Sequence, residues 1–356
     1  MTQNKAENRI EWLDALRGLA LLIVYLAHVI ARYASTEKYS HGVGKIGVWF
    51  FMLSAGYLLL MRVPEKLDGR WLLGYYIGKF FRLFPCLVVG AFLVYREDIR
   101  HSAKEILQTV FFLKGPQHLW YIPVLAVFYL VAPLVILTDR FVKNRAVLAG
   151  VCILFGTAFA LIYPFTEYPE NSIALKWYLP VFMMGILLWY VTHLTENTGK
   201  RGEKAISGGG NRKKCWAFWD GLALLAAFTI VALTPAVTCG LFHSGNTRFL
   251  PNKYLLIGGL WFLILLGLIN GKAGRRILEK CRPLVWLSRI SYPMYIVHYP
   301  IIAILKKKWE PGGLTMLPAA FMVSLVLSVI LHYVPEKPAD KLGRKIRSYL
   351  MSRKRI

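Results

Sequence analysis

The sequence predicts an all-α fold: a polytopic membrane bundle of about ten transmembrane helices, with both termini in the cytoplasm. Three observations support this prediction. The 356 residues are 56% hydrophobic and only 18% charged, which is more apolar than soluble domains of this size. Apolar runs recur along the whole chain, close to the roughly 20 residues that a helix needs to cross a membrane. The runs are unbroken, whereas the strands of a membrane barrel alternate between apolar and polar residues.

Ten apolar runs follow one another as predicted spans. They cover residues 11–31, 44–61, 71–95, 118–138, 146–165, 176–195, 216–240, 253–271, 284–305 and 314–334. Because ten is an even number, both termini are expected on the same side of the membrane. Lys and Arg concentrate in the connections that then lie inside, so the positive-inside rule places the termini in the cytoplasm. Lys306, Lys307 and Lys308 oppose this bias, which makes the last helical pair the least well defined by charge.

The net charge of +25 has the same explanation, because Lys and Arg accumulate in cytoplasmic loops of membrane proteins. We therefore expect membrane lipid, and no nucleic acid, among the partners. The five cysteines are scattered without a CxxC pair, so neither a disulfide framework nor a metal site is expected. The first apolar run has no cleavage motif after it, and it is expected to act as the targeting signal.

A single membrane domain is expected to fill residues 1–356. Its expected parts are a front bundle of six helices (1–195), a basic flexible cytoplasmic loop (196–215), a back group of four helices (216–335) and a basic cytoplasmic tail (336–356). The loop, ENTGKRGEKAISGGGNRKKC, has the Gly-rich polar composition of a flexible linker. No inverted repeat of the kind found in many transporters is evident.

The first span, LDALRGLALLIVYLAH, contains two polar groups that lipid disfavours, Arg17 and His28. Eleven residues turn a helix through about 1100°, close to three full turns, so both side chains share one face about 16 Å apart. An arginine in mid-membrane costs roughly 2.5–3.5 kcal/mol, and such residues usually face the bundle interior. The alternative is structural: Asp14 pairs with Arg17 near the membrane surface while the arginine snorkels toward water.

The third span, YYIGKFFRLFPCL, places Lys79 and Arg82 three residues apart on one helix face. Two basic helices that converge from the cytoplasmic side would form a positive well, which suits a phosphorylated cofactor. The alternative is a simple anchor at the cytoplasmic edge, with Lys79 snorkelling. No P-loop or GxGxxG accompanies the basic residues, so nucleotide hydrolysis is not indicated.

Several stretches, taken in order, resemble one known family. Arg17-x10-His28 is the most specific of them. The others are GVWFFMLSAGYLL, which holds Ser54, the basic GKFFRLFP, then HLWYIPVLAVFYLVAPLV, SRISYPMYIVHYPI and PEKPADKL. Together they cover the chain from residue 10 to about 345, and the ordered set resembles the acyltransferase 3 family of integral-membrane acyltransferases. One departure is Lys79, where the family commonly has arginine; lysine keeps the charge but loses bidentate phosphate recognition.

The resemblance implies about ten helices in a bacterial plasma (inner) membrane. It also implies transfer of an acyl group, by default acetyl, from cytoplasmic acyl-CoA to a hydroxyl of an envelope or exported polysaccharide. Acyl-CoA is then a co-substrate, and no permanently bound cofactor or metal is expected. Some relatives carry an extracytoplasmic hydrolase-like domain. This sequence shows none, so we expect it to complete the transfer itself or to pass the acyl group to a separate extracytoplasmic transferase or glycan-synthesis complex.

The expected roles follow from this chemistry. Arg17, Arg82 and Lys79 would bind the phosphates of CoA, and His28 would act as the general base that deprotonates the acceptor hydroxyl. Asp14, Ser54, His118, Trp120, Ser291, Tyr292, His298 and Glu336 are possible supporting residues. Among them Ser54, Trp120 and Tyr292 are candidates for stabilising the oxyanion. His298 is functional or a packing residue, His118 caps a helix or touches the acceptor, and Glu336 ends the last helix near a basic partner.

Two other functions fit parts of the sequence. A transporter or exporter of an acylated carrier or a glycan would line its path with the same intramembrane charges. A structural partner in an envelope-synthesis complex would use its basic tail to bind anionic lipid.

Overall fold

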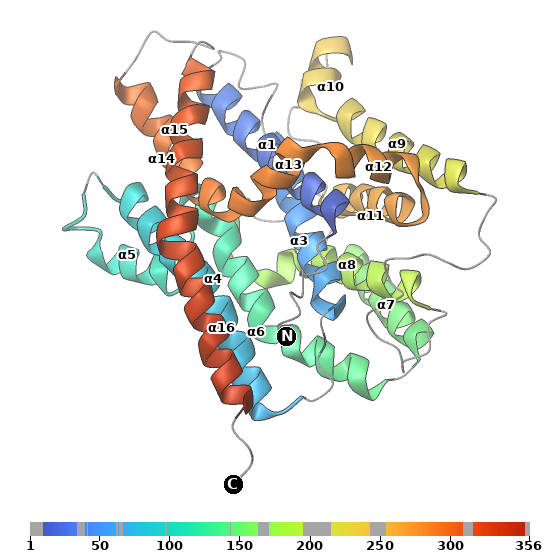
Figure 1. Ribbon diagram of the computed structural model, residues 1–356. Coiled ribbons are helices and arrows are strands. Elements are labelled where there is room, and N and C mark those ends of the chain that lie inside the picture. The colour runs from blue at the N-terminus through green and yellow to red at the C-terminus, as the bar shows by residue number, and fades with distance from the viewer. Residues whose placement is uncertain are drawn as a thin grey trace.

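The computed structural model describes residues 10–33, 40, 42–61, 63, 67–96, 98–142, 144–162, 171–194, 215–242, 254–308 and 316–352. Those residues form helices and no strand, which confirms the all-α fold (Figure 1). The predicted loop at 196–215 lies outside the described residues except for Cys215.

The helices are α1 (Glu11–Tyr33), α3 (Val43–Met61), α4 (Gly69–Val94), α5 (Ala103–Val110), α6 (Tyr121–Phe141), α7 (Arg145–Ile162), α8 (Leu179–Thr192), α9 (Trp216–Ala232), α10 (Pro235–Phe242), α11 (Tyr254–Asn270), α12 (Ala273–Lys280), α13 (Arg282–Leu287), α14 (Ser291–Lys308), α15 (Met316–Leu331) and α16 (Lys337–Ser352). Short 3-10 helices, η1 (Gln117–Trp120), η2 (Leu175–Trp177) and η3 (Ser288–Ile290), precede α6, α8 and α14, and a π turn, His332–Glu336, joins α15 to α16.

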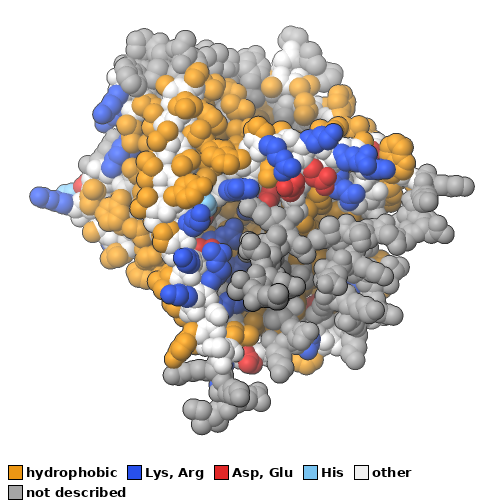
Figure 2. Space-filling model, in the orientation of Figure 1, with side chains coloured by type: hydrophobic (Ala, Val, Ile, Leu, Met, Phe, Trp, Pro, Cys, Tyr) orange, Lys and Arg blue, Asp and Glu red, His pale blue; other side chains and the backbone are white. Residues whose placement is uncertain are grey.

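Apolar helices long enough to cross a membrane confirm the membrane class. Among the described residues five helical stretches meet this test, and a sixth does if the bent pair α11–α12 counts as one span. Each of the ten predicted spans overlaps a helix. The apolar stretches Arg145–Phe159, Leu179–Thr192 and Trp216–Ala232 are too short for the test, however, and α14 does not meet it either, so the number ten and the cytoplasmic termini remain predictions. Figure 2 shows a broad hydrophobic surface over α14 and α15 and basic side chains gathered over α12 and α16. A surface of this kind is suited to lipid.

Helix α1 is packed at the centre of the bundle, against α3, α12, α13 and α14. Its residue Gly18 allows α13 to approach closely, because a Cβ there would lie 2.2 Å from the carbonyl oxygen of Leu284. The polar groups of α1 therefore face other helices and not lipid alone. Helices of the expected front and back groups thus share one packed interior.

The C-terminal helix differs from the prediction. Residues 317–352 form one continuous helical stretch of 36 residues, which lies along α4 (Figure 1). We expected the last span to stop at 334 and Glu336 to end it, and this was wrong. Pro335 has no N–H to continue the α-helical pattern, but it lies within the π turn, whose wider spacing lets the helix continue into α16.

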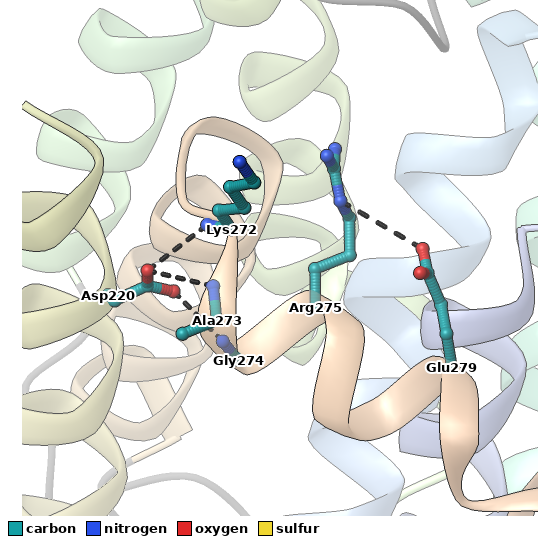
Figure 3. Close-up of polar contacts among 6 residues, drawn as sticks. All are labelled: Asp220, Lys272, Ala273, Gly274, Arg275 and Glu279. Atoms are coloured by element: carbon teal, nitrogen blue, oxygen red, sulfur yellow. Dashed lines mark hydrogen bonds and ion pairs between the residues drawn. The ribbon is translucent and has the colours of Figure 1, made fainter. Parts of the chain in front are cut away.

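A buried carboxylate fixes the bend of 93° between α11 and α12. Asp220 of α9 accepts hydrogen bonds from three successive backbone N–H groups: those of Lys272 and Ala273 at Oδ2, 3.1 and 2.9 Å away, and that of Gly274 at Oδ1, 3.0 Å away (Figure 3). These are donors that a helix start leaves without intrahelical partners. Asp220 therefore caps α12 from a neighbouring helix.

Candidate active site

Three histidines from separate elements meet inside the bundle. His28 comes from α1, His118 from η1 and His298 from α14. The Nδ1 atom of His28 lies 3.0 Å from Nε2 of His298, and the ring of His118 lies 5.2 Å, centroid to centroid, from that of His298. His298 is fully buried, His118 is buried, and His28 is partly exposed. The structure thus brings together the predicted base and two of the predicted supporting residues.

The hydrogen-bond partners assign the protons of this cluster. Nδ1 of His298 faces two carbonyl oxygens, those of Met294 at 3.0 Å and Tyr295 at 2.8 Å. A carbonyl can only accept, so Nδ1 of His298 carries the proton and its Nε2 accepts from the Nδ1–H of His28. The lone pair of neutral His28 then lies on Nε2. A neutral imidazole with an available lone pair can act as a general base.

His118 has one ring nitrogen that is buried without a hydrogen-bond partner in the described chain, which its sequence position did not predict. Its Nε2 lies 2.9 Å from the carbonyl oxygen of Ile296, so this nitrogen carries the proton and Nδ1 holds the lone pair. That Nδ1 is buried and finds no hydrogen-bond partner within the described chain. His118 is therefore neither a surface cap nor a loop residue. It leaves a buried acceptor open to a hydroxyl or a water molecule.

Two residues beside the histidines were missed by the sequence analysis, Arg32 and Tyr299. The Tyr299 ring stacks on His118, with centroids 5.1 Å apart, and meets His28 edge-on at 5.3 Å. The Arg32 guanidinium lies 4.8 Å above Tyr299 and donates a hydrogen bond to its hydroxyl. Their positions in the sequence could have revealed them, because Arg32 lies one helical turn after His28 and Tyr299 directly follows His298.

The predicted basic residues also converge. Arg17 of α1 lies 3.5 Å from the carboxylate of Asp14, and the charge of Arg82 on α4 acts on both Arg17 and Lys79. The Asp14 pair expected from the sequence is therefore present, yet it does not isolate Arg17 from the other cations. Like charges in a low-dielectric wall repel one another, so this arrangement favours a bound anion.

Tyr129 of α6 lies among these three cations and was also missed. The Lys79 ammonium lies 3.7 Å from the centre of its ring and hydrogen-bonds its hydroxyl, while Arg17 and Arg82 act on it electrostatically. Arg347 of α16 reaches the same place, where its side chain lies against Gly74 and its charge acts on Lys79. We call Arg17, Lys79, Arg82 and Arg347 the basic cluster.

Tyr292 and Glu336 lie beside the basic cluster. The hydroxyl of Tyr292 donates to the carbonyl of Leu83 at 2.6 Å, and the charges of Arg82 and Glu336 both act on it. Glu336 is hydrogen-bonded to His332 at 2.7 Å, which is a different partner from the basic tail residue we expected. Both residues can therefore shape the wall of the basic cluster.

The other supporting residues have structural partners. The Ser54 hydroxyl donates to the carbonyl of Phe51 in its own helix, and Trp120 is packed against Trp49 and Tyr178. Ser291 is buried at the start of α14. No set of three His, Cys, Asp or Glu side chains within the described residues is arranged to hold a metal.

The two clusters lie on the same side of α1. His28 contacts α14, the charge of Arg82 on α4 acts on Arg17, and α4 contacts α14, which itself packs against α1. The eleven residues between them correspond to about 16 Å along the helix. One connected face therefore presents cations at one end and an imidazole lone pair at the other.

Comparison with known proteins gives a family and two curated relatives. Residues 10–334 match the family model described as an acyltransferase domain. YrhL of Bacillus subtilis (strain 168), which its name proposes to be a peptidoglycan O-acetyltransferase, is 21% identical over 378 aligned positions, covering 94% of this chain and 55% of the relative. The peptidoglycan O-acetyltransferase OatA of Listeria monocytogenes serovar 1/2a (strain ATCC BAA-679 / EGD-e) is 24% identical over 337 positions, covering 82% of this chain and 49% of the relative.

This chain spans about half the length of the curated relatives it matches. No solved structure matches it. The family model, in contrast, covers nearly all of the described helices and includes every residue of the histidine cluster. The chain belongs to the acyltransferase 3 family.

Proposed function

We propose that the chain is a membrane O-acyltransferase that moves an acetyl group from acetyl-CoA to a hydroxyl of an envelope glycan, with peptidoglycan as the first candidate. The observation that carries this proposal is the hydrogen bond between His28 and His298, because His28 lies on α1, the helix that also bears Arg17. The names of the two relatives support the acetyl group and the peptidoglycan acceptor.

The basic cluster is the proposed site for the phosphates of CoA. Phosphate oxygens would take hydrogen bonds from the guanidinium groups of Arg17 and Arg82 and from the ammonium of Lys79. The thin pantetheine arm would then run along α1 toward His28. The arm would have to span the distance of about 16 Å between the two ends of this face.

His28 is the proposed general base. Its Nε2 takes the proton of the acceptor hydroxyl while the hydroxyl oxygen forms a bond to the thioester carbonyl carbon. The C–S bond then breaks, the acyl group stays on the acceptor oxygen, and the leaving thiolate takes the proton from His28. His298 accepts the hydrogen bond from Nδ1 throughout, which holds the ring in place and favours its transient positive charge.

The proposed orientation follows the charge bias of the sequence. The basic cluster would open to the cytoplasm, where acyl-CoA is found, and the histidine cluster would lie toward the outer half of a bacterial plasma membrane. The acceptor would come from the outer side. A separate extracytoplasmic transferase, or a glycan-synthesis complex, is the partner to consider if the purified chain consumes acetyl-CoA but does not acetylate the glycan.

The test uses the purified full chain in lipid nanodiscs with radiolabelled acetyl-CoA and soluble peptidoglycan fragments. Label should move to the fragments, and His28→Ala should abolish the transfer while binding of CoA is retained. His101→Ala is the matched control, because His101 is exposed in the connection after α4. Transfer that survives in His28→Ala would remove the proposed base, and the absence of any CoA binding by the unmodified protein would point to transport.

A further inference from the structure

Arg32 lies beyond the proposed base, on the side away from the basic cluster. It is four residues after His28 in α1, so the two side chains share a helix face. Its guanidinium covers Tyr299, whose ring in turn contacts both His28 and His118. One aromatic ring thus connects this cation to two imidazoles.

The charge of Arg32 has no carboxylate partner within ion-pair distance in the described part of the chain. A position in the last turn of α1 gives some stabilisation by the helix dipole. The side chain, however, crosses to α14 and donates to the Tyr299 hydroxyl. A planar guanidinium has five N–H donors in a fork-like arrangement. A single phenol oxygen cannot accept from all of them, so some donors remain for an anion.

The course of the proposed reaction places the acceptor here. The thioester approaches from the basic cluster, and its carbonyl carbon must meet the acceptor hydroxyl whose proton Nε2 of His28 takes. The acceptor must therefore approach from the opposite side, where Arg32, Tyr299 and the open Nδ1 of His118 lie. An acceptor that carries both hydroxyls and a carboxylate would match these three groups.

We propose that Arg32 and Tyr299 form a subsite for a carboxylate of the acceptor, which holds that acceptor with its hydroxyl at His28. The guanidinium binds the carboxylate through two N–H donors, and the Tyr299 hydroxyl adds a third. His118 accepts a hydrogen bond from a neighbouring hydroxyl through Nδ1. This inference rests on the proposed function and adds the chemical class of the acceptor: a glycan with an acidic group near the acylated hydroxyl.

The experiment compares two soluble peptidoglycan fragments that differ only in charge. One has free carboxylates and the other has them converted to methyl esters. For each fragment, KM and kcat of acetyl transfer and the Kd of direct binding are measured in nanodiscs. We expect Arg32→Gln to raise KM and Kd for the free acid about tenfold or more, as loss of a charge-assisted pair predicts. The ester should bind the unmodified protein as weakly as the acid binds Arg32→Gln.

Two further variants separate binding from folding. Arg32→Lys keeps the charge without the fork and should recover part of the affinity for the free acid. Tyr299→Phe keeps the ring and should raise KM for the acid by a smaller factor. Arg275→Gln is the matched control, because Arg275 pairs with Glu279 on α12, away from the histidines.

Other results overturn the inference. An Arg32→Gln variant that lowers kcat equally for the acid, the ester and hydrolysis by water would place Arg32 at the oxyanion. Equal Kd values for acid and ester in the unmodified protein would mean that no carboxylate is recognised. If the unmodified protein transfers no acetyl group to either fragment, the proposed function fails, but the difference in Kd between acid and ester still tests the subsite.

Discussion

His28 and His298 stand 270 residues apart in the sequence, and their rings share a hydrogen bond of 3.0 Å. The carbonyls of Met294 and Tyr295 fix the direction of that bond, because they can only accept. His298 is thus a positioning residue for the proposed base. It sets which nitrogen of His28 is available without touching the substrate itself.

Substitution of His298 should separate positioning from packing. In His298→Gln, the amide oxygen can still accept from Nδ1 of His28, whereas His298→Ala leaves that N–H without a buried partner. We expect His298→Ala to lower kcat by about 10- to 100-fold and His298→Gln to recover part of this loss. The measurement is kcat and KM for acetyl transfer over a range of pH. A purely structural role would lower thermal stability and leave the pH profile unchanged.

Arg17 should act on binding more than on chemistry. Arg17→Gln removes one of the cations that would contact the CoA phosphates, so we expect the Kd for acetyl-CoA to rise about tenfold or more. The rate at saturating acetyl-CoA should change less. Equilibrium binding and single-turnover kinetics measure the two effects. If the bound-state rate falls more than the affinity, Arg17 serves the reaction centre.

Lys79 allows a substitution that should keep or strengthen the binding of acetyl-CoA. Arginine has a planar fork that matches phosphate, whereas lysine is a point charge. Lys79→Arg should therefore keep or tighten acetyl-CoA binding, and Lys79→Gln should weaken it severalfold. Binding that weakens by the same factor in both variants would show that the contact between Lys79 and Tyr129 matters more than the charge.

The Asp220 cap should contribute to stability without affecting the site chemistry. Asp220→Asn replaces one carboxylate oxygen by an NH₂ group, which cannot accept from the backbone N–H groups at the start of α12. We expect a loss of about 1–3 kcal/mol in the free energy of unfolding and a lower Tm in detergent. Glu279→Gln breaks only a partly exposed pair of 3.9 Å and should change stability by less than about 1 kcal/mol. Equal effects of the two substitutions would contradict this role for the cap.

The periodicity of single helices predicted a large part of this molecule. It placed helices at the apolar runs, and it put Arg17 and His28 on one face because a helix has a fixed turn per residue. Lys79 and Arg82 were predicted in the same way. Their charges do act together with that of Arg17 in the structure.

Packing between distant segments could not be predicted from one sequence. The meeting of His28 with His298 and His118 depends on how α14 and η1 pack against α1, which no local pattern encodes. Tyr129 escaped attention because aromatic residues are common in membrane helices. The continuation of helix through Pro335 was missed because a proline usually stops a helix, and the π turn that admits it has no clear local signal.

The unbroken helix from Leu317 to Ser352 has a consequence for the shape of the protein in its membrane. Its 36 residues make a rod about 54 Å long, which exceeds the roughly 40–45 Å of a whole bilayer with its headgroups. Unless the helix tilts strongly, one of its ends extends into water. The α16 end carries the charged residues, so it is the end expected to do so. That end carries Arg347, whose charge acts on Lys79. It would therefore form a basic extension outside the membrane, which a soluble polyphosphate would meet before it enters the bundle.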